Sequence, residues 1–280
     1  MKSIVLYSNC QALQIMHYLQ KSPTFVANYK CYHININIYL PNGKAGSATE
    51  LLALDAEALK SADILICQFI KTDRGHLNHT NIIAQTSPDC KVIMVPHYRF
   101  SGYAYGHGNQ EVRDKVKEII ASNPDRETAI AEIRSYFESE AFKDQTSEIE
   151  EHLKTELTKL KEIDQNEAGP IKMWDIVNHM YRHIRLFNKP LYPNTLFFYH
   201  WTRRFLAYIG INDIERYVFL PKNHHLHWYH VMTPIYPAVA KGLKLEFEID
   251  DIRFYGKFQR YRPIKDMYEY IYLSHTEPLI

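Results

Sequence analysis

The chain has 280 residues, 46% of them hydrophobic, which is enough for one large core or for one core with a smaller helical annex. Its 33 basic and 32 acidic residues leave a formal charge of +1. Proteins that bind nucleic acids or anionic membranes usually carry a broad positive field, so the balance argues against both partners and indicates that any anionic ligand is held locally.

The compartment is predicted from apolar runs and cysteines. The start of the chain, residues 1–7, is too short for a signal-peptide core or a membrane span, and no later apolar run reaches spanning length. The four cysteines form no CxxC pair and no disulfide-like spacing; they are Cys10, Cys31, Cys67 and Cys90. We therefore expect a cytoplasmic protein without a membrane span.

The first hundred residues alternate short apolar runs with helical patterns. Residues 3–7 predict a buried strand and residues 12–19 the helix after it. Ile34, Ile36 and Ile38 alternate with asparagines as in a half-exposed strand, and two further strands are predicted over 63–69 and 91–95. This order predicts an α/β fold in which a mainly parallel sheet is flanked by helices.

A helical insertion is predicted over residues 111–168, where Glu, Lys, Asp and Ala dominate. Asn123-Pro124 has the pattern of a helix cap followed by a proline at the first helical position. One face of the last helix is apolar, which favours a packed helical hairpin over a partner-binding helix; its residues are Ile149, Leu153, Leu157, Leu160 and Ile163. The core is then expected to comprise 1–110 and 169–280.

The last hundred residues begin after Gly169-Pro170. Helices are predicted over 174–185 and from about Asn194 to Gly210. Residues 253–262 mix aromatic with basic side chains that could stack on bases, but at this net charge a solvated pair of strands is favoured.

Three predicted strand ends carry polar side chains. Ligands of open parallel sheets bind outside the carboxyl ends of the strands. Ser8-Asn9-Cys10-Gln11 follows the first strand, Gln68 ends the third, and residues 96–103, Pro-His-Tyr-Arg-Phe-Ser-Gly-Tyr, follow the fourth. A thiol, several amides and an imidazole are therefore expected at one rim.

Cys10 is the candidate nucleophile. It precedes a predicted helix, whose free N–H groups and partial positive charge would lower the thiol pKa. Those N–H groups, with the amides of Asn9, Gln11 or Gln68, could form an oxyanion hole. The sequence equally allows Cys10 to be a small buried residue. The other cysteines are assigned to packing.

His97 is the candidate base, because histidine accepts a proton near neutral pH. The alternative is a histidine that holds a proline-containing turn. Histidines also gather at 75–79 and 223–230, but neither run matches a known metal-ligand spacing, so no metal is expected. The phosphate signatures GxxxxGK[ST] and GxGxxG are absent.

Four segments together resemble the WcbI-type polysaccharide biosynthesis proteins. They are residues 8–11 (Ser-Asn-Cys-Gln), 62–68 (Ala-Asp-Ile-Leu-Ile-Cys-Gln), 96–103 and 186–190 (Leu-Phe-Asn-Lys-Pro). The family is similar to SGNH hydrolases, with cysteine at the serine position, which implies an SGNH- or flavodoxin-like core. It is associated with surface-glycan loci, coenzyme A binding and proposed acetyl transfer.

The resemblance places Cys10 at the centre of the site. It implies that the oxyanion and substrate-binding residues are Ser8, Asn9, Gln11, Gln68, Tyr98, Arg99, Gly102, Tyr103 and Asn188. Ser8 departs from the family's glycine. Lys189 stands where the family has histidine, which leaves His97 or His200 as the base; Lys189 and Arg99 are candidates for binding a coenzyme A phosphate.

The leading functional hypothesis is acyl transfer, with acetyl the expected group, from a coenzyme A thioester to a sugar hydroxyl of a surface or capsular polysaccharide precursor. Acetyl-CoA is then a substrate, and the partners are a small acyl donor and a carbohydrate acceptor; a homo-oligomer is left open. Two alternatives remain: an SGNH-like esterase or deacetylase, and a non-catalytic protein that binds coenzyme A or a glycan.

Overall fold

The computed structural model describes residues 1–9, 11–39, 51–70, 72–105, 110–139, 142, 146–189, 192–214, 235–247, 254–255, 261–262 and 267–276. Its contacts divide the chain into two compact units. Unit 1 takes residues 1–97, 161–175 and 195–219; unit 2 takes residues 98–160, 176–194 and 220–280. None of the described helices is long and apolar enough to cross a membrane.

The division differs from the expected insertion over 111–168. Helix α8, Thr146–Asn166, runs from unit 2 into unit 1. Ile149, near its start, packs against Gly242 of unit 2. Beyond its end, the N–H of Gly169 donates to the carbonyl of Met94 in unit 1. Residues of this helix therefore belong to both units. The composition of 111–168 had indicated a single separate insertion.

Unit 1 contains, within the described residues, a four-stranded parallel sheet of order β2-β1-β3-β4. This confirms the predicted α/β class. The strands are β1, Lys2–Ser8; β2, Tyr29–Asn35; β3, Ile64–Gln68; and β4, Lys91–Val95. The helices of this unit are α1, Gln11–Leu19; α2, Pro23–Asn28; α3, Ala53–Lys60; α4, His79–Ile83; and α10, Thr195–Tyr208, with 3-10 turns η1, Ile36–Ile38, and η3, Thr72–Leu77. Helix α9, Trp174–Met180, has its first two residues in unit 1 and the rest in unit 2.

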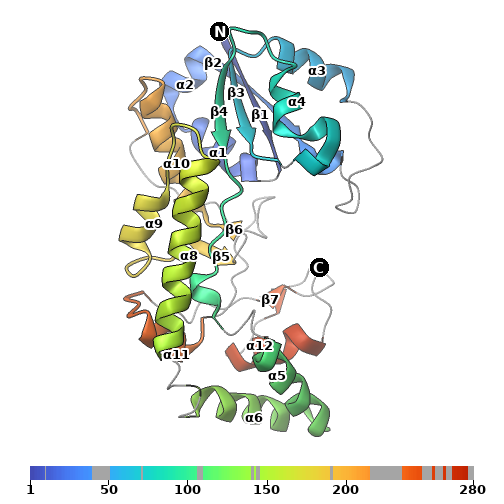
Figure 1. The fold of residues 1–280 in the computed structure, drawn as a ribbon, viewed down its shortest axis with the longest axis vertical. Helices are drawn as coiled ribbons and strands as arrows, with labels where there is room; N and C mark the ends of the chain where they lie inside the picture. The colour runs from blue at the N-terminus through green and yellow to red at the C-terminus, as the bar shows by residue number, and fades with distance from the viewer. Residues whose placement is uncertain are drawn as a thin grey trace. The chain divides into compact units, whose positions relative to one another are not determined.

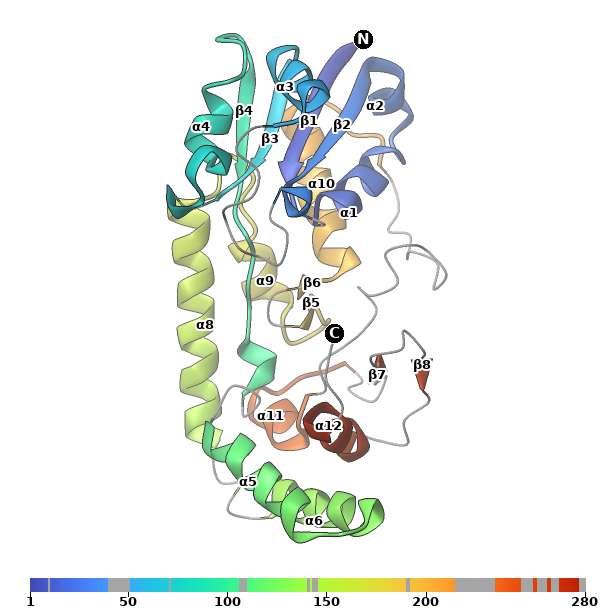
Figure 2. The ribbon, with the colours of Figure 1, turned by 90° about the vertical axis from the view of Figure 1, so that its right-hand side faces the viewer.

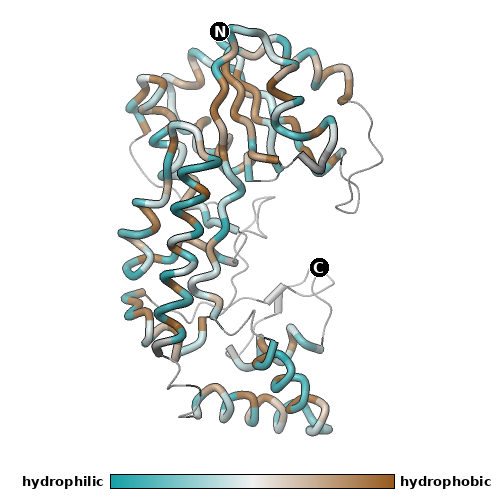
Figure 3. Tube along the Cα trace, in the orientation of Figure 1, coloured by the Kyte–Doolittle hydropathy of each residue, from teal (hydrophilic) through white to brown (hydrophobic). Residues whose placement is uncertain are grey.

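Helices cover both faces of this sheet (Figures 1 and 2). Alternate residues of a strand point to opposite faces. Val5 and Tyr7 of β1 join the core that includes Leu59 of α3 and Ile82 of α4. The opposite face is covered by α1 and α10, which meet at the rings of Tyr18 and Tyr199. Figure 3 shows the strands as the most continuous hydrophobic stretches of the unit.

The predicted strand over 34–38 begins earlier and ends earlier than expected. β2 stops at Asn35, and residues 36–38 form η1. The side-chain oxygen of Asn35 accepts a hydrogen bond from the N–H of Asn37, at 3.1 Å. Asparagine side chains that bind nearby backbone in this way compete with strand pairing. The alternation of isoleucine with asparagine therefore extends beyond the end of β2, and the strand end predicted from it was too late.

The outer edge of β4 is covered by the turn that follows α8. The N–H of Gly169 donates to the carbonyl of Met94 at 2.9 Å. A Cβ at position 169 would lie 3.0 Å from the Met94 nitrogen, so a larger residue would push the two backbones apart by a few tenths of an ångström, whereas glycine needs no such shift. The turn thus occupies part of the strand edge.

Helix α9 is shorter than the predicted helix over 174–185, ending at Met180. Its start is fixed by Asp164 of α8, whose buried carboxylate accepts hydrogen bonds from the N–H groups of Met173 and Trp174. Helix α10 matches the prediction within a residue or two, and Gly210 beyond it has a φ of +84°.

Unit 2 consists mainly of helices. Its elements are η4, Gly102–Ala104; α5, Gln110–Ser122; α6, Arg126–Glu138; α11, Pro237–Gly242; α12, Met267–Thr276; and the strands β5, Phe187–Lys189; β6, Tyr192–Pro193; β7, Phe254–Tyr255; and β8, Tyr261–Arg262. Helix α12 packs on α5 and α6 (Figure 2). The antiparallel pair β7-β8 confirms the strand pair favoured for the basic aromatic tail.

The predicted cap at Asn123-Pro124 is wrong by two residues. Asp125 is the N-cap of α6, and its carboxylate accepts from the N–H of Thr128 at 2.8 Å. The side chain of Asn123 instead donates to the carbonyl of Ile119 at the end of α5. On the predicted apolar face of α8, Ile149, Leu153 and Leu160 are buried, as expected.

Candidate functional site

The end of β1 turns directly into α1. Oδ1 of Asn9 accepts a hydrogen bond from the N–H of Gln11 at 2.9 Å, and its carbonyl accepts from the N–H of Ala12 at 3.2 Å. This is an Asx turn, a local geometry that asparagine favours. Cys10, the predicted centre of the site, lies outside the described residues. Ser8 and Gln11, on either side, are buried.

Gln68 ties the end of β3 to this turn. Its Oε1 accepts a hydrogen bond from the N–H of Asn9 at 2.9 Å, and its side chain is almost fully buried. β1 and β3 are neighbours in the sheet, with Tyr7 paired to Cys67. Two of the predicted site residues are therefore bonded to each other across adjacent strand ends.

These contacts fix which way two carboxamides point. A backbone N–H can only donate, so the atom that it meets must be the amide oxygen. The oxygens of Asn9 and Gln68 are both taken in this way. Their NH₂ groups consequently face away from those contacts.

The first N–H groups of α1 are engaged by the chain itself. The sequence favoured free N–H groups here as part of an oxyanion hole, but those of Gln11 and Ala12 donate to Asn9. The side chains of Asn9 and Gln68 add two further amide NH₂ groups to this turn.

His97 follows the next strand of the same unit. Val95 of β4 pairs with Gln68, and His97 lies two residues further and is half-buried. Since β4 is two strands from β1, the strand axes lie about 10 Å apart at an inter-strand spacing of about 4.8 Å. The end of β3, with Gln68, lies between the β1 turn and His97 in the sheet order.

His33 is a histidine at this rim that the sequence did not single out. It lies on β2, and its Nε2 is 3.2 Å from the carbonyl oxygen of Ser8. Burial lowers the pKa of His33, opposed by the carbonyls of Ser8 and Asn9 and by the carboxylate of Asp55. Nothing in the alternating strand pattern distinguished it; only the register of β2 with β1 brings it to Ser8.

The predicted residues after His97 belong to unit 2. Tyr98 is fully buried and Arg99 is exposed. The hydroxyl of Tyr103 donates to the carbonyl of Tyr181 at 2.9 Å, and burial strongly raises its pKa. Tyr103 is thus part of the core of this unit.

Gly102 lies against the ring of Phe100. A Cβ at position 102 would come within 2.4 Å of the ring, which is itself buried and packed on Tyr103 and Phe187. The glycine is therefore needed for close packing of this segment.

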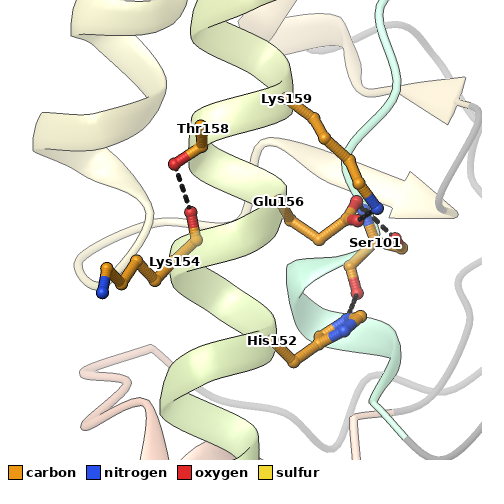
Figure 4. Close-up of polar contacts among 6 residues, drawn as sticks. All are labelled: Ser101, His152, Lys154, Glu156, Thr158 and Lys159. Atoms are coloured by element: carbon orange, nitrogen blue, oxygen red, sulfur yellow. Dashed lines mark hydrogen bonds and ion pairs between the residues drawn. The ribbon is translucent and has the colours of Figure 1, made fainter.

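Helix α8 holds the same segment through Ser101 (Figure 4). The carboxylate of Glu156 accepts from both the N–H and the hydroxyl of Ser101 and pairs with Lys159 at 2.7 Å. Nε2 of His152 meets the Ser101 carbonyl at 2.9 Å. Ser, His and Glu are the residue types of a hydrolase triad, but here the histidine contacts backbone and the carboxylate contacts the serine, so the set positions the chain.

Asn188 and Lys189 form part of β5. Asn188 is buried, and its carbonyl accepts a hydrogen bond from Nη2 of Arg185 at 3.0 Å. Nε of Arg185 also donates to the carbonyl of Phe187, at 2.9 Å. The backbone of Lys189 pairs with Tyr192.

Burial suppresses the reactivity of the other cysteines. It raises the pKa of Cys31 and of Cys67 to about 12 and also raises that of Cys90. Thiols with raised pKa values are poor nucleophiles at neutral pH. This agrees with their assignment to packing.

Metal ligands do not gather in the described part of the chain, where no group of three or more His, Cys, Asp and Glu side chains is arranged to hold an ion. The predicted histidine run over 223–230 lies outside the described residues. In the other run, His79 places Nδ1 at 2.5 Å from the carbonyl of Ile70.

The fold and the rim define an α/β protein whose polar strand ends meet at the carboxyl edge of a parallel sheet, where this class binds ligands. The model of the family described as polysaccharide biosynthesis enzyme WcbI matches residues 3–213. The chain belongs to this WcbI family of polysaccharide biosynthesis enzymes.

Among solved structures, the chain is similar to one described as WcbI, a novel polysaccharide biosynthesis enzyme, in its native form without a disulfide bond between coenzyme A and one of its cysteines. The TM-score is 0.63 at 16% identity, over 88% of this chain and 80% of that one. At this identity the likeness establishes the fold. No curated protein matches the chain.

Proposed function

We propose that the protein transfers an acyl group, with acetyl as the expected group, from a coenzyme A thioester to a sugar hydroxyl during polysaccharide biosynthesis. The observation that carries this proposal is the contact between Asn9 and Gln68, which orients two amide NH₂ groups at the turn directly before Cys10. The coenzyme A named with the similar WcbI structure supports the choice of donor.

The proposed chemistry begins with the Cys10 thiolate. It attacks the thioester carbonyl carbon, and the negative charge that develops on the carbonyl oxygen is met by the NH₂ groups of Asn9 and Gln68. The bond from carbon to the coenzyme A sulfur then breaks, and coenzyme A leaves as a thiolate. The acyl group remains on Cys10.

The second step returns Cys10 to its thiolate form. The sugar hydroxyl attacks the acyl-Cys10 carbonyl while His97 accepts its proton, and the Cys10 sulfur leaves. The separation of β1 and β4 by one intervening strand supports this division of labour, in which His97 acts on the acceptor hydroxyl and not on the thiol.

Calorimetric titration with coenzyme A and acetyl-CoA, followed by mass spectrometry of the protein incubated with acetyl-CoA, tests the proposal. Micromolar binding, about −8 kcal/mol, with an acetyl adduct on Cys10 is expected. Turnover of aryl esters without coenzyme A affinity would point to an SGNH-like esterase. Acetyl transfer that survives in Cys10→Ala would replace the covalent relay with direct transfer.

A further inference from the structure

One peptide group at the end of β1 is held by side chains from both neighbouring strands. The carbonyl of Ser8 and the N–H of Asn9 belong to the same peptide, and in a trans peptide these groups point in opposite directions. The N–H meets Oε1 of Gln68 on β3 at 2.9 Å. The carbonyl meets Nε2 of His33 on β2 at 3.2 Å.

The order of the strands explains why side chains reach this peptide from both sides. β1 lies between β2 and β3, so the two side chains approach the peptide from opposite sides. On the β3 side the backbone pairing of β1 ends at Tyr7, and on the β2 side it ends at Ser8. At the point where the sheet ends and the turn towards Cys10 begins, side chains therefore supply the hydrogen bonds that neighbouring backbone supplies within the sheet.

The contact of His33 shows which ring nitrogen carries a hydrogen, and its environment shows which charge state is favoured. A carbonyl oxygen can only accept, so Nε2 must carry the hydrogen. Burial lowers the pKa of His33, while the carbonyls of Ser8 and Asn9 and the carboxylate of Asp55 act in the opposite direction. Asp55 is itself bound by the hydroxyls of Tyr32 and Tyr39. At neutral pH His33 is consequently a neutral ring that donates from Nε2.

We propose that His33 is a positioning residue that, together with Gln68, fixes the peptide between Ser8 and Asn9 and thereby the placement of the Cys10 thiol and the Asn9 amide towards the acyl donor. This inference rests on the proposed acyl transfer. His33 contacts the backbone of the turn and acts through it.

Two polar substitutions separate positioning from general stability. Glutamine carries an N–H donor close to the position of the histidine Nε2, whereas asparagine carries one close to Nδ1 and falls short of the Ser8 carbonyl. His33→Gln is expected to keep kcat for acetyl transfer close to that of the wild type. His33→Asn and His33→Leu are expected to lower kcat by roughly tenfold to a hundredfold, because a shift of about 1 Å in the reacting groups can cost that much.

The readouts are kcat and KM for acetyl-CoA, the rate of Cys10 alkylation by iodoacetamide mapped by mass spectrometry, and the melting temperature. KM is expected to change little, and Cys10 alkylation to fall in parallel with kcat. His275→Leu is the matched control, since His275 is a half-buried histidine of unit 2 whose Nδ1 contacts the carbonyl of Ile271; it should leave kcat and Cys10 alkylation unchanged.

The outcomes distinguish this inference from the proposed function. If the wild type neither binds coenzyme A nor transfers acetyl, the proposed function fails. If the wild type is active and His33→Gln and His33→Asn have the same kcat at matched melting temperatures, His33 has no positioning role and this inference is overturned.

Discussion

The N–H of Asn9 donates to Oε1 of Gln68 at 2.9 Å, joining the ends of two adjacent parallel strands through a side chain. Replacing Gln68 by methionine keeps the volume but leaves this N–H without its partner. We expect Gln68→Met to lower the free energy of unfolding by about 1 to 3 kcal/mol, the cost of leaving a polar group unpaired. Urea denaturation measures this.

The control for Gln68 is Gln85→Met. Gln85 donates to the carbonyl of Asn81 on the surface of α4, and its replacement should change the stability by at most about 0.5 kcal/mol. Equal losses of unfolding free energy in the two variants would show that the contact between Asn9 and Gln68 stabilises the fold no more than an exposed contact does.

Gly102→Ala is expected to destabilise unit 2, because the new methyl group would collide with the buried ring of Phe100. Overpacking of this kind costs about 1 to 3 kcal/mol. A smaller side chain at position 100 should relieve the collision, so Gly102→Ala combined with Phe100→Leu should be more stable than the sum of the single effects predicts. Strict additivity in thermal denaturation would argue against the close contact.

Glu156 and Ser101 are expected to be coupled energetically. A double-mutant cycle of Glu156→Gln and Ser101→Ala should give a coupling of about 1.5 to 3 kcal/mol, the range for hydrogen bonds to a charged group. The exposed pair Glu151–Lys154, at 3.7 Å on the same helix, is the control and should give at most about 0.5 kcal/mol.

The same carboxylate has a pH signature. Burial disfavours ionisation of Glu156, but the hydrogen bonds from Lys159 and Ser101 outweigh it and lower the pKa. The stability that this group contributes is therefore present above the unfolded value of about 4.3 and is lost as the pH falls through the lower folded pKa. If the double-mutant cycle of Glu156 and Ser101 gave the same coupling energy at pH 7 and well below pH 4, this prediction would be contradicted.

The cysteines should differ in their rates of alkylation. With iodoacetamide at pH 7.5, Cys31 and Cys67 should react slowly in the folded protein, because burial raises the pKa of each to about 12. Cys10, if it is the nucleophile, should be modified first. Peptide mapping over time measures the four rates, and unfolding in urea should make them similar; modification of Cys67 before Cys10 would count against the proposed chemistry.

His200 should make the protein less stable in mild acid. Burial and then the charges of Arg203 and Arg204 lower the pKa of His200. Since the unfolded chain then binds more protons, stability is full above the unfolded pKa of about 6.5 and falls as the pH drops through that value towards the folded pKa. Thermal denaturation between pH 7.5 and 5 should show a shallower loss for His200→Gln than for the wild type. An identical slope would exclude this histidine as a source of the effect.

The sheet was predictable because its signal is local. Buried strands at 3–7, 63–69 and 91–95 left apolar runs between helical patterns, and the structure places β1, β3 and β4 there within one or two residues. The end of β2 was missed, because the bond between the Asn35 side chain and Asn37 overrides the isoleucine alternation. The α6 cap was misplaced, because Asn123 and Asp125 are both good capping residues and only tertiary structure decides between them.

The site was predictable only in part. The pairing of β1 with β3 follows from the fold class, so Asn9 and Gln68 could be expected at one rim. His33 could not, because its meeting with Ser8 depends on the register of β2 and on the sheet order, neither of which is encoded in a motif. The hydrogen bond from the N–H of Gln11 to Asn9 was likewise not predictable. The sequence at the start of a helix does not show whether its first N–H groups are already hydrogen-bonded.

The turn at Gly169 also bears on how the protein stays separate from other chains. Exposed strand edges recruit strands from neighbouring molecules and start aggregation. By binding Met94 at the outer edge of β4, the turn after α8 blocks part of that template. Gly169→Val, whose Cβ would crowd the backbone of Met94, is therefore expected to release an aggregation-prone edge.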